Sequence, residues 1–146
     1  MLVTLRPNII QKEMTLKERE NEIIDEFSMY EDWMDRYQYL IELGQELEPL
    51  KEDEKNDETL IRGCQSQVWI VSERKDGRIY FRGESDAIIV KGIVAMLMKV
   101  VSGCAIDEVR GCDFSFVEEI GLREHLSPTR SNGVLAMIER IKRLAQ

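Results

Sequence analysis

The sequence is poor in residues that bind metals or form disulfides, with three cysteines and a single histidine among 146 residues. Cys64, Cys104 and Cys112 form an odd set without Cys-x-x-Cys spacing, so neither a disulfide framework nor a zinc ribbon is predicted. A metal or iron-sulfur site needs three or four converging ligands and would consume nearly all of these residues together with His125. We therefore expect no resident cofactor, and the unpaired cysteines fit a reducing cytoplasm.

A basic surplus and a long apolar run are also absent. The net charge is −8, and residues 1–60 alone carry −10, so nucleic acid is not an expected partner, because phosphate binding needs a basic face. The most apolar stretch, residues 87–101, is interrupted by two lysines and is too short to cross a bilayer. Residues 1–14 contain Pro7 and Asn8 where the apolar core of a signal peptide would run. We expect a soluble protein with no membrane association.

The residues that are present suffice for one domain with a single core. Residues 1–13 show no periodicity and are predicted to be a disordered extension, which leaves 14–146 as the folded domain. Apolar residues at helical spacing predict helices, and apolar, β-branched and alternating residues predict strands joined at an Asp-Gly turn. The segments are helical 16–27, 33–44, 88–100 and 134–144, and extended 68–72 and 78–82. This order predicts an α+β fold, a small antiparallel sheet with helices packed against it.

Three local signals mark expected boundaries. Ser85 or Asp86 is a candidate cap for the helix at 88–100. Ser115 and Glu118 have the spacing of a capping box for a further short helix. The charged run 51–58 is predicted to be a solvated loop.

Cys64 is the residue from which function can be argued. Its neighbours Arg62, Gly63 and Gln65 are loop or surface residues by composition, whereas a buried structural cysteine normally sits in an apolar pattern. Gly63 removes bulk beside the sulfur, and Arg62 is placed to favour the thiolate, which is the nucleophilic form. An inert cysteine at the start of a strand is the alternative that this segment leaves open. The other two cysteines lie in contexts where small apolar filler is the usual role.

Other chemistry fits the sequence less well. A hydrolase pairing Cys64 with His125 would need a third group to orient the ring, and the segment around Cys64 matches no cysteine-protease signature. Residues 83–86 lack the Gly-Lys-Ser/Thr ending of a phosphate-binding loop. One accessible thiol without an acid-base apparatus suits a sulfur or redox carrier better than a self-contained enzyme.

Four blocks of the sequence resemble the SufE family of sulfur acceptor proteins. Residues 61–70, IRGCQSQVWI, resemble the signature segment of that family. Residues 39–44 resemble the end of its second helix, 85–92 the start of its core helix, and 121–137 its C-terminal motif. The blocks stand in family order over nearly the whole chain. Glu84, where Asp is frequent in the family, is a mild departure.

The resemblance implies a fold shared with IscU-type scaffolds and a cytoplasmic carrier rather than an enzyme. Such a carrier accepts sulfane sulfur as a persulfide from a pyridoxal-phosphate cysteine desulfurase, SufS-like or CsdA-like, raises its turnover, and passes the sulfur to a SufBCD-type scaffold complex. Cys64 matches the acceptor cysteine of the family. Arg130 is the candidate for a supporting role, since a guanidinium can favour a thiolate or pair with a carboxylate of a partner.

Two alternatives stay open at this point. The first is an IscU-type metal or iron-sulfur scaffold, which differs from a carrier in the number of ligands it needs. The second concerns assembly, because the sequence does not decide between a monomer and a homodimer.

Overall fold

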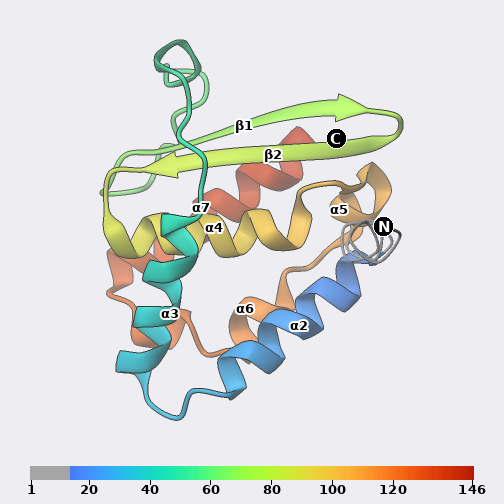
Figure 1. Cartoon of the computed structure of the whole chain (residues 1–146). Helices are drawn as coiled ribbons and strands as arrows, with labels where there is room; N and C mark the ends of the chain where they lie inside the picture. The colour runs from blue at the N-terminus through green and yellow to red at the C-terminus, as the bar shows by residue number, and fades with distance from the viewer. Residues whose placement is uncertain (1–13) are drawn as a thin grey trace, which may run out of the picture.

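The computed structural model describes residues 14–146, so the expectation for residues 1–13 lies outside the described residues. The fold is α+β, as predicted, with a small antiparallel sheet above a layer of helices (Figure 1). No helix of the described part is long and apolar enough to span a bilayer. In chain order the elements are α2 (Leu16–Ser28), α3 (Trp33–Gln45), η1 (Glu52–Glu54), β1 (Val68–Lys75), β2 (Arg78–Ser85), α4 (Ile88–Val101), β3 (Cys104–Ala105), α5 (Ile106–Gly111), α6 (Ser115–Glu119), η2 (Arg123–His125) and α7 (Pro128–Leu144).

The first two helices start at side-chain caps. The Thr15 hydroxyl accepts a hydrogen bond from the backbone N–H of Glu18 at 3.1 Å, and the Glu18 carboxylate accepts from the N–H of Thr15 at 3.0 Å. This is a capping box that satisfies two helix-end donors at once. Asp32 caps α3 by accepting from the N–H of Asp35 at 2.9 Å. Both helices predicted from periodicity are therefore present.

The β1–β2 hairpin is longer than the sequence pattern predicted. Asp76 and Gly77 form its turn with φ of 54° and 78°, the left-handed pair that suits a two-residue hairpin loop. Pairing runs from Lys75 with Arg78 to Val68 with Ser85. The prediction of β1 lacked the three residues nearest the turn, which are polar and exposed. The prediction of β2 lacked its last three residues, 83–85, at the end far from the turn. The two-residue strand β3, which pairs with β2, is too short to leave a pattern and was missed.

Helix α4 is the centre of the core. Ten of its fourteen residues are buried, as expected for a helix that is apolar all round. It lies beneath the sheet, with α2 and α3 on its far side (Figure 1). The crossing with α3 is very close, since a Cβ on Gly92 would overlap the Leu40 carbonyl and one on Gly44 would come within 2.9 Å of the Gly92 nitrogen. Glycine at both positions lets the two backbones meet.

Helix α7 begins six residues before the predicted start at Val134. Ser127 is its N-cap, with the hydroxyl accepting from the N–H of Arg130 at 3.2 Å, and Pro128 is the first helical residue. Periodicity missed this turn because its side chains are mostly polar and exposed, although Ser-Pro is a common start signal. Arg130 therefore lies in the first turn of a helix, not in a loop before it.

Ser85 and Asp86 do not cap α4, contrary to expectation, because the N-cap is Ala87. The Asp86 carboxylate accepts from the N–H of Gln67 at 3.0 Å. The Ser85 hydroxyl donates to the Gln67 carbonyl at 2.8 Å and accepts from the N–H of Ala87 at 3.3 Å. The two side chains thus fasten the residue that precedes β1 to the junction between β2 and α4.

The predicted capping box at Ser115 is also wrong. Phe114, in the left-handed region with φ of 56°, is the N-cap of α6, and Ser115 is its first residue. The carboxylate of Asp113 accepts from the N–H of Ser115 at 3.0 Å. The side chain that accepts a hydrogen bond at the start of α6 is therefore that of Asp113, two positions before the predicted Ser115.

The charged run 51–58 is more than a solvated loop. It lies on the face of the hairpin opposite α4, where the chain rises above the sheet in Figure 1. Glu54 pairs with Arg82 of β2, and Lys55 lies 3.3 Å from the Glu84 carboxylate and 5.5 Å from the centroid of the Trp69 ring. These contacts fix the path of the chain toward Cys64.

Candidate functional site

The Cys64 loop, residues 62–67, is held closed at its base. The N–H of Ile61 donates to the Val68 carbonyl at 2.8 Å. Gly63 has φ of +94°, which a residue with a side chain adopts only at a cost. Sequence reasoning expected glycine here for access to the sulfur, and the backbone conformation supplies a second reason for it.

The Cys64 thiol packs against α7. Its Sγ lies 3.6 Å from the Gly133 carbonyl oxygen, to which the S–H donates. A Cβ on residue 133 would lie 3.3 Å from this sulfur, so glycine makes room for it. A cavity of about 40 Å³ adjoins the thiol, more than the roughly 10–15 Å³ that a single water needs. Its lining residues are Cys64, Gln65, Ser66, Val90, Ile93, Thr129, Arg130, Gly133 and Met137.

Burial raises the pKa of the Cys64 thiol, and no charged side chain of the described residues lowers it. The cysteine is half-buried and rests as the neutral thiol at pH 7. Arg62 is exposed on the loop, so the thiolate support that its position suggested is not exerted in this resting arrangement. Since the thiolate is the nucleophile, Cys64 must gain water or a basic group before it reacts.

The structure brings Arg130 to the cavity and leaves His125 elsewhere. Arg130 is exposed and lines the cavity with its neighbour Thr129. The His125 ring stacks on Trp33 with centroids 3.9 Å apart, and its Nδ1 lies 3.0 Å from the Gly121 carbonyl. His125 is not among the described residues that line the cavity. This geometry gives a Cys-His hydrolase no support.

The other two cysteines are buried, as their apolar contexts predicted. The Cys104 thiol donates to the Val100 carbonyl at 3.4 Å. The Cys112 sulfur lies 3.7 Å from the Glu20 carboxylate, and burial is the main cause that raises the pKa of Cys112 to about 11. Within residues 14–146, no three His, Cys, Asp or Glu side chains come together as metal ligands.

Sequence reasoning missed the residues of α7 that hold the loop. Gly133, Met137 and Arg140 follow at i, i+4 and i+7, the spacing of one helix face. The first two line the cavity, and the Arg140 guanidinium donates to the Glu58 and Leu60 carbonyls, both at 3.1 Å. Helical spacing could have grouped these three residues, but it does not show that the face meets the Cys64 loop.

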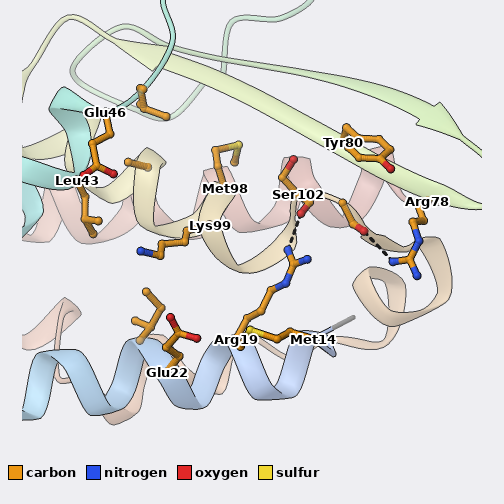
Figure 2. Close-up of a pocket in the computed structure, with 14 residues that line it drawn as sticks. Met14, Arg19, Glu22, Leu43, Glu46, Arg78, Tyr80, Met98, Lys99 and Ser102 are labelled. Carbon is orange, nitrogen blue, oxygen red and sulfur yellow. Dashed lines mark hydrogen bonds between the residues drawn. The ribbon is translucent and has the colours of Figure 1, made fainter. Parts of the chain in front are cut away.

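A larger cavity of about 870 Å³ lies between α2, α3, α4 and the turn end of β2. Figure 2 shows Arg19 donating to the Ser102 carbonyl, at 2.5 Å, and Arg78 to the Gly103 carbonyl, at 2.9 Å. Side chains of both charges surround it, and none of its described lining residues is a cysteine or histidine. Size therefore does not select the candidate site, because Cys64 lines the smaller cavity and not the larger one.

Comparisons with known proteins find similar sequences along most of this chain. A family model described as "SufE: Fe-S metabolism associated domain" matches residues 21–145. An uncharacterized SufE-like protein of Rhizobium meliloti (strain 1021) is 42% identical over 131 residues, covering 86% of this chain and 94% of the relative. One of Rhizobium etli is 41% identical over 131 residues, covering 86% and 88%.

A solved structure shares the fold. The solution structure of a hypothetical protein from Thermus thermophilus is similar with a TM-score of 0.73 and 19% sequence identity, and it covers 87% of this chain and 93% of that one. At this identity the similarity concerns the arrangement of helices and strands alone.

Proposed function

The chain belongs to the SufE family, whose domain is associated with Fe-S metabolism, and from this premise we propose that it is a sulfur carrier that acts through Cys64. It takes sulfane sulfur from a pyridoxal-phosphate cysteine desulfurase in the cytoplasm and passes it to an iron-sulfur assembly scaffold. The observation that supports this most directly is the setting of Cys64. It alone of the three cysteines lies on a loop beside a cavity, while Cys104 and Cys112 are buried in the core.

The proposed step is a thiol-disulfide exchange with a persulfide as the electrophile. The Cys64 thiolate attacks the terminal sulfur carried by the desulfurase cysteine. A new S–S bond forms on Cys64 while the S–S bond of the desulfurase persulfide breaks, and the desulfurase cysteine leaves as a thiolate. The proton of the Cys64 thiol goes to solvent or to a base of the partner. The exchange involves no net oxidation and therefore needs no redox cofactor. It frees the desulfurase cysteine of its persulfide sulfur, so that the desulfurase can begin another turnover.

The resting geometry defines what the carrier must do before and after transfer. Because Cys64 is neutral and packed on Gly133, the thiol has to leave α7 to reach a partner cysteine. The cavity beside it has room for one further heavy atom, so the outer sulfur of a persulfide can be sheltered there after transfer. At the rim, Arg130 is placed to stabilise the emerging thiolate or to pair with a carboxylate of the desulfurase.

The second candidate function, an IscU-type scaffold, needs ligands that converge. In the described residues the cysteines and the histidine do not gather into such a set, and two of the three thiols have core partners. This dispersion favours the carrier.

Intact-mass measurement after incubation with a cysteine desulfurase and cysteine tests the proposal. The wild type, Cys104→Ser and Cys112→Ser should each gain the mass of one sulfur, and Cys64→Ser should gain none while keeping its fold. An undiminished gain on Cys64→Ser would remove Cys64 as the acceptor. Metal analysis of the same samples tests the scaffold. One tightly held zinc or iron per chain, lost in Cys64→Ser, would replace the carrier proposal with the scaffold.

A further inference from the structure

One guanidinium of α7 holds the chain just before the Cys64 loop. Arg140 donates to three successive backbone carbonyls, those of Glu58 and Leu60 at 3.1 Å and that of Thr59 at 3.5 Å. The planar fork of arginine suits several acceptors at once, whereas a lysine ammonium acts as a point charge. The contacts tie α7 to a segment about eighty residues earlier in the chain.

The face of α7 that carries Arg140 also carries Gly133, against which the Cys64 thiol packs. Gly133 receives the Cys64 sulfur, Met137 lines the cavity one turn later, and Arg140 follows on the same face. The other end of the loop is fixed separately, because Asp86 binds the N–H of Gln67 at 3.0 Å. Besides the Ile61–Val68 hydrogen bond that closes its base, the loop therefore has a side-chain anchor at each end. Of these two, the Arg140 anchor belongs to the helix that buries the sulfur.

We propose that Arg140 is a positioning residue that sets the resting place of Cys64. By fixing residues 58–60 to α7, Arg140 holds the loop at the position along this helix where the Cys64 thiol contacts Gly133. Without the guanidinium, water can reach the Glu58 and Leu60 carbonyls, and the Thr59 carbonyl keeps its hydrogen bond from the N–H of Ile70 at 3.1 Å. The segment before the loop then loses its attachment to α7, and the thiol spends more time away from Gly133. The relevance of this anchor to sulfur transfer rests on the proposed function, whereas its effect on the position of Cys64 concerns the protein alone.

Alkylation by iodoacetamide, followed for each cysteine by peptide mass spectrometry, tests this position without any partner. Arg140→Ala should raise the rate at Cys64 on the order of fivefold, the factor that corresponds to about 1 kcal/mol. Arg140→Lys should give an intermediate rate. The pH profile of the Cys64 reaction should shift toward lower pH in Arg140→Ala, because a thiol that gains water loses the burial that raises its pKa.

Two controls separate positioning from unfolding. Cys104 and Cys112 are buried within the same molecule, and their rates should stay unchanged in every variant. Arg143→Ala is the matched substitution, since Arg143 lies three residues further along α7 and pairs with Glu139 at 3.0 Å, and it should leave the Cys64 rate at the wild-type value.

Three results would overturn the proposal: an unchanged Cys64 rate and pH profile in Arg140→Ala, a parallel rise at Cys104 and Cys112, or an equal rise in Arg143→Ala. Failure of the carrier proposal is seen separately, as a missing sulfur on Cys64 in the desulfurase assay. Either proposal can fail while the other stands.

Discussion

Gly133→Ala places a methyl group where the Cys64 thiol rests. The added Cβ would lie 3.3 Å from Sγ and 3.8 Å from both the Cα and Cβ of Cys64. The closest atom is the end of a side chain that can rotate about one bond, while the Cα and Cβ of Cys64 are at ordinary contact distance. We therefore expect the sulfur to be pushed outward by at least a few tenths of an ångström, which disfavours its packed position, while the loop backbone stays in place.

Two opposing contributions decide the free energy of unfolding of this variant. Alanine is favoured over glycine in a helix interior by about 0.8–1 kcal/mol, and residue 133 lies well inside α7. Displacing the thiol removes a weak S–H hydrogen bond and the burial of one small group, about 1 kcal/mol together. These nearly cancel, so the melting temperature should stay within about 3 °C of wild type. The displaced population of Cys64 should nevertheless rise about fivefold.

Thermal melts and Cys64 alkylation, measured on the same preparation, test this separation of stability from accessibility. Gly111→Ala is the control, because a Cβ there meets nothing within 4 Å, and it should leave the Cys64 rate unchanged. A melting temperature lowered by several degrees in Gly133→Ala, together with faster reaction at Cys104 and Cys112, would contradict this prediction. A Cys64 rate no higher than that of the wild type would contradict it as well.

Three further predictions concern packing, pH and transfer. Gly92→Ala should lower the free energy of unfolding by at least about 2 kcal/mol in urea titrations, because its Cβ would overlap the Leu40 carbonyl and force α3 and α4 apart. Burial raises the pKa of Cys112 from 9.0 to about 11, so the stability that this thiol contributes is present below about pH 9 and is lost as the pH rises through about 11. When the free energy of unfolding is measured by chemical denaturation across that pH range, its decrease with rising pH should be smaller by roughly 2–3 kcal/mol in Cys112→Ala than in the wild type. Arg130→Ala should weaken desulfurase stimulation by up to about fivefold at subsaturating concentrations without changing thermal melts, since exposed ion pairs contribute at most about 1 kcal/mol. Arg130→Lys should restore part of the stimulation. Unchanged stimulation by Arg130→Ala would remove Arg130 from the site.

The helices and strands that could be predicted from the sequence are those in which many apolar residues follow one regular spacing. Helix α4 has ten buried residues to mark it, and the hairpin turn has Asp76 and Gly77, whose positive φ angles require an unusual pair of residues. The first turn of α7 and the strand β3 were missed because neither has an apolar period to detect. Strand β3 exists because β2 offers an edge beside it, which is a tertiary cause.

The candidate acceptor cysteine could be picked out from composition, but its environment could not. Cys64 stands out because its neighbours are polar, but their polarity does not decide whether the thiol is exposed or turned inward. It is half-buried because Gly133, 69 residues later, provides a seat for the sulfur. Arg140 acts over a similar separation through backbone carbonyls, which carry no signature in the sequence. Contacts of this kind depend on which helix face the fold turns toward the loop.

Burial of Cys64 separates its reactivity toward small molecules from its reactivity toward a partner. Free iodoacetamide must wait for the thiol to leave Gly133, so variants that loosen the loop should react faster. A desulfurase that docks first can draw the thiol out and supply the basic environment that the resting site lacks. If this is how transfer works, Gly133→Ala and Arg140→Ala should gain several-fold in alkylation but much less in sulfur acceptance at saturating desulfurase. Equal gains in both reactions would instead mean that spontaneous release of the thiol limits transfer, and that the partner plays no part in opening the site.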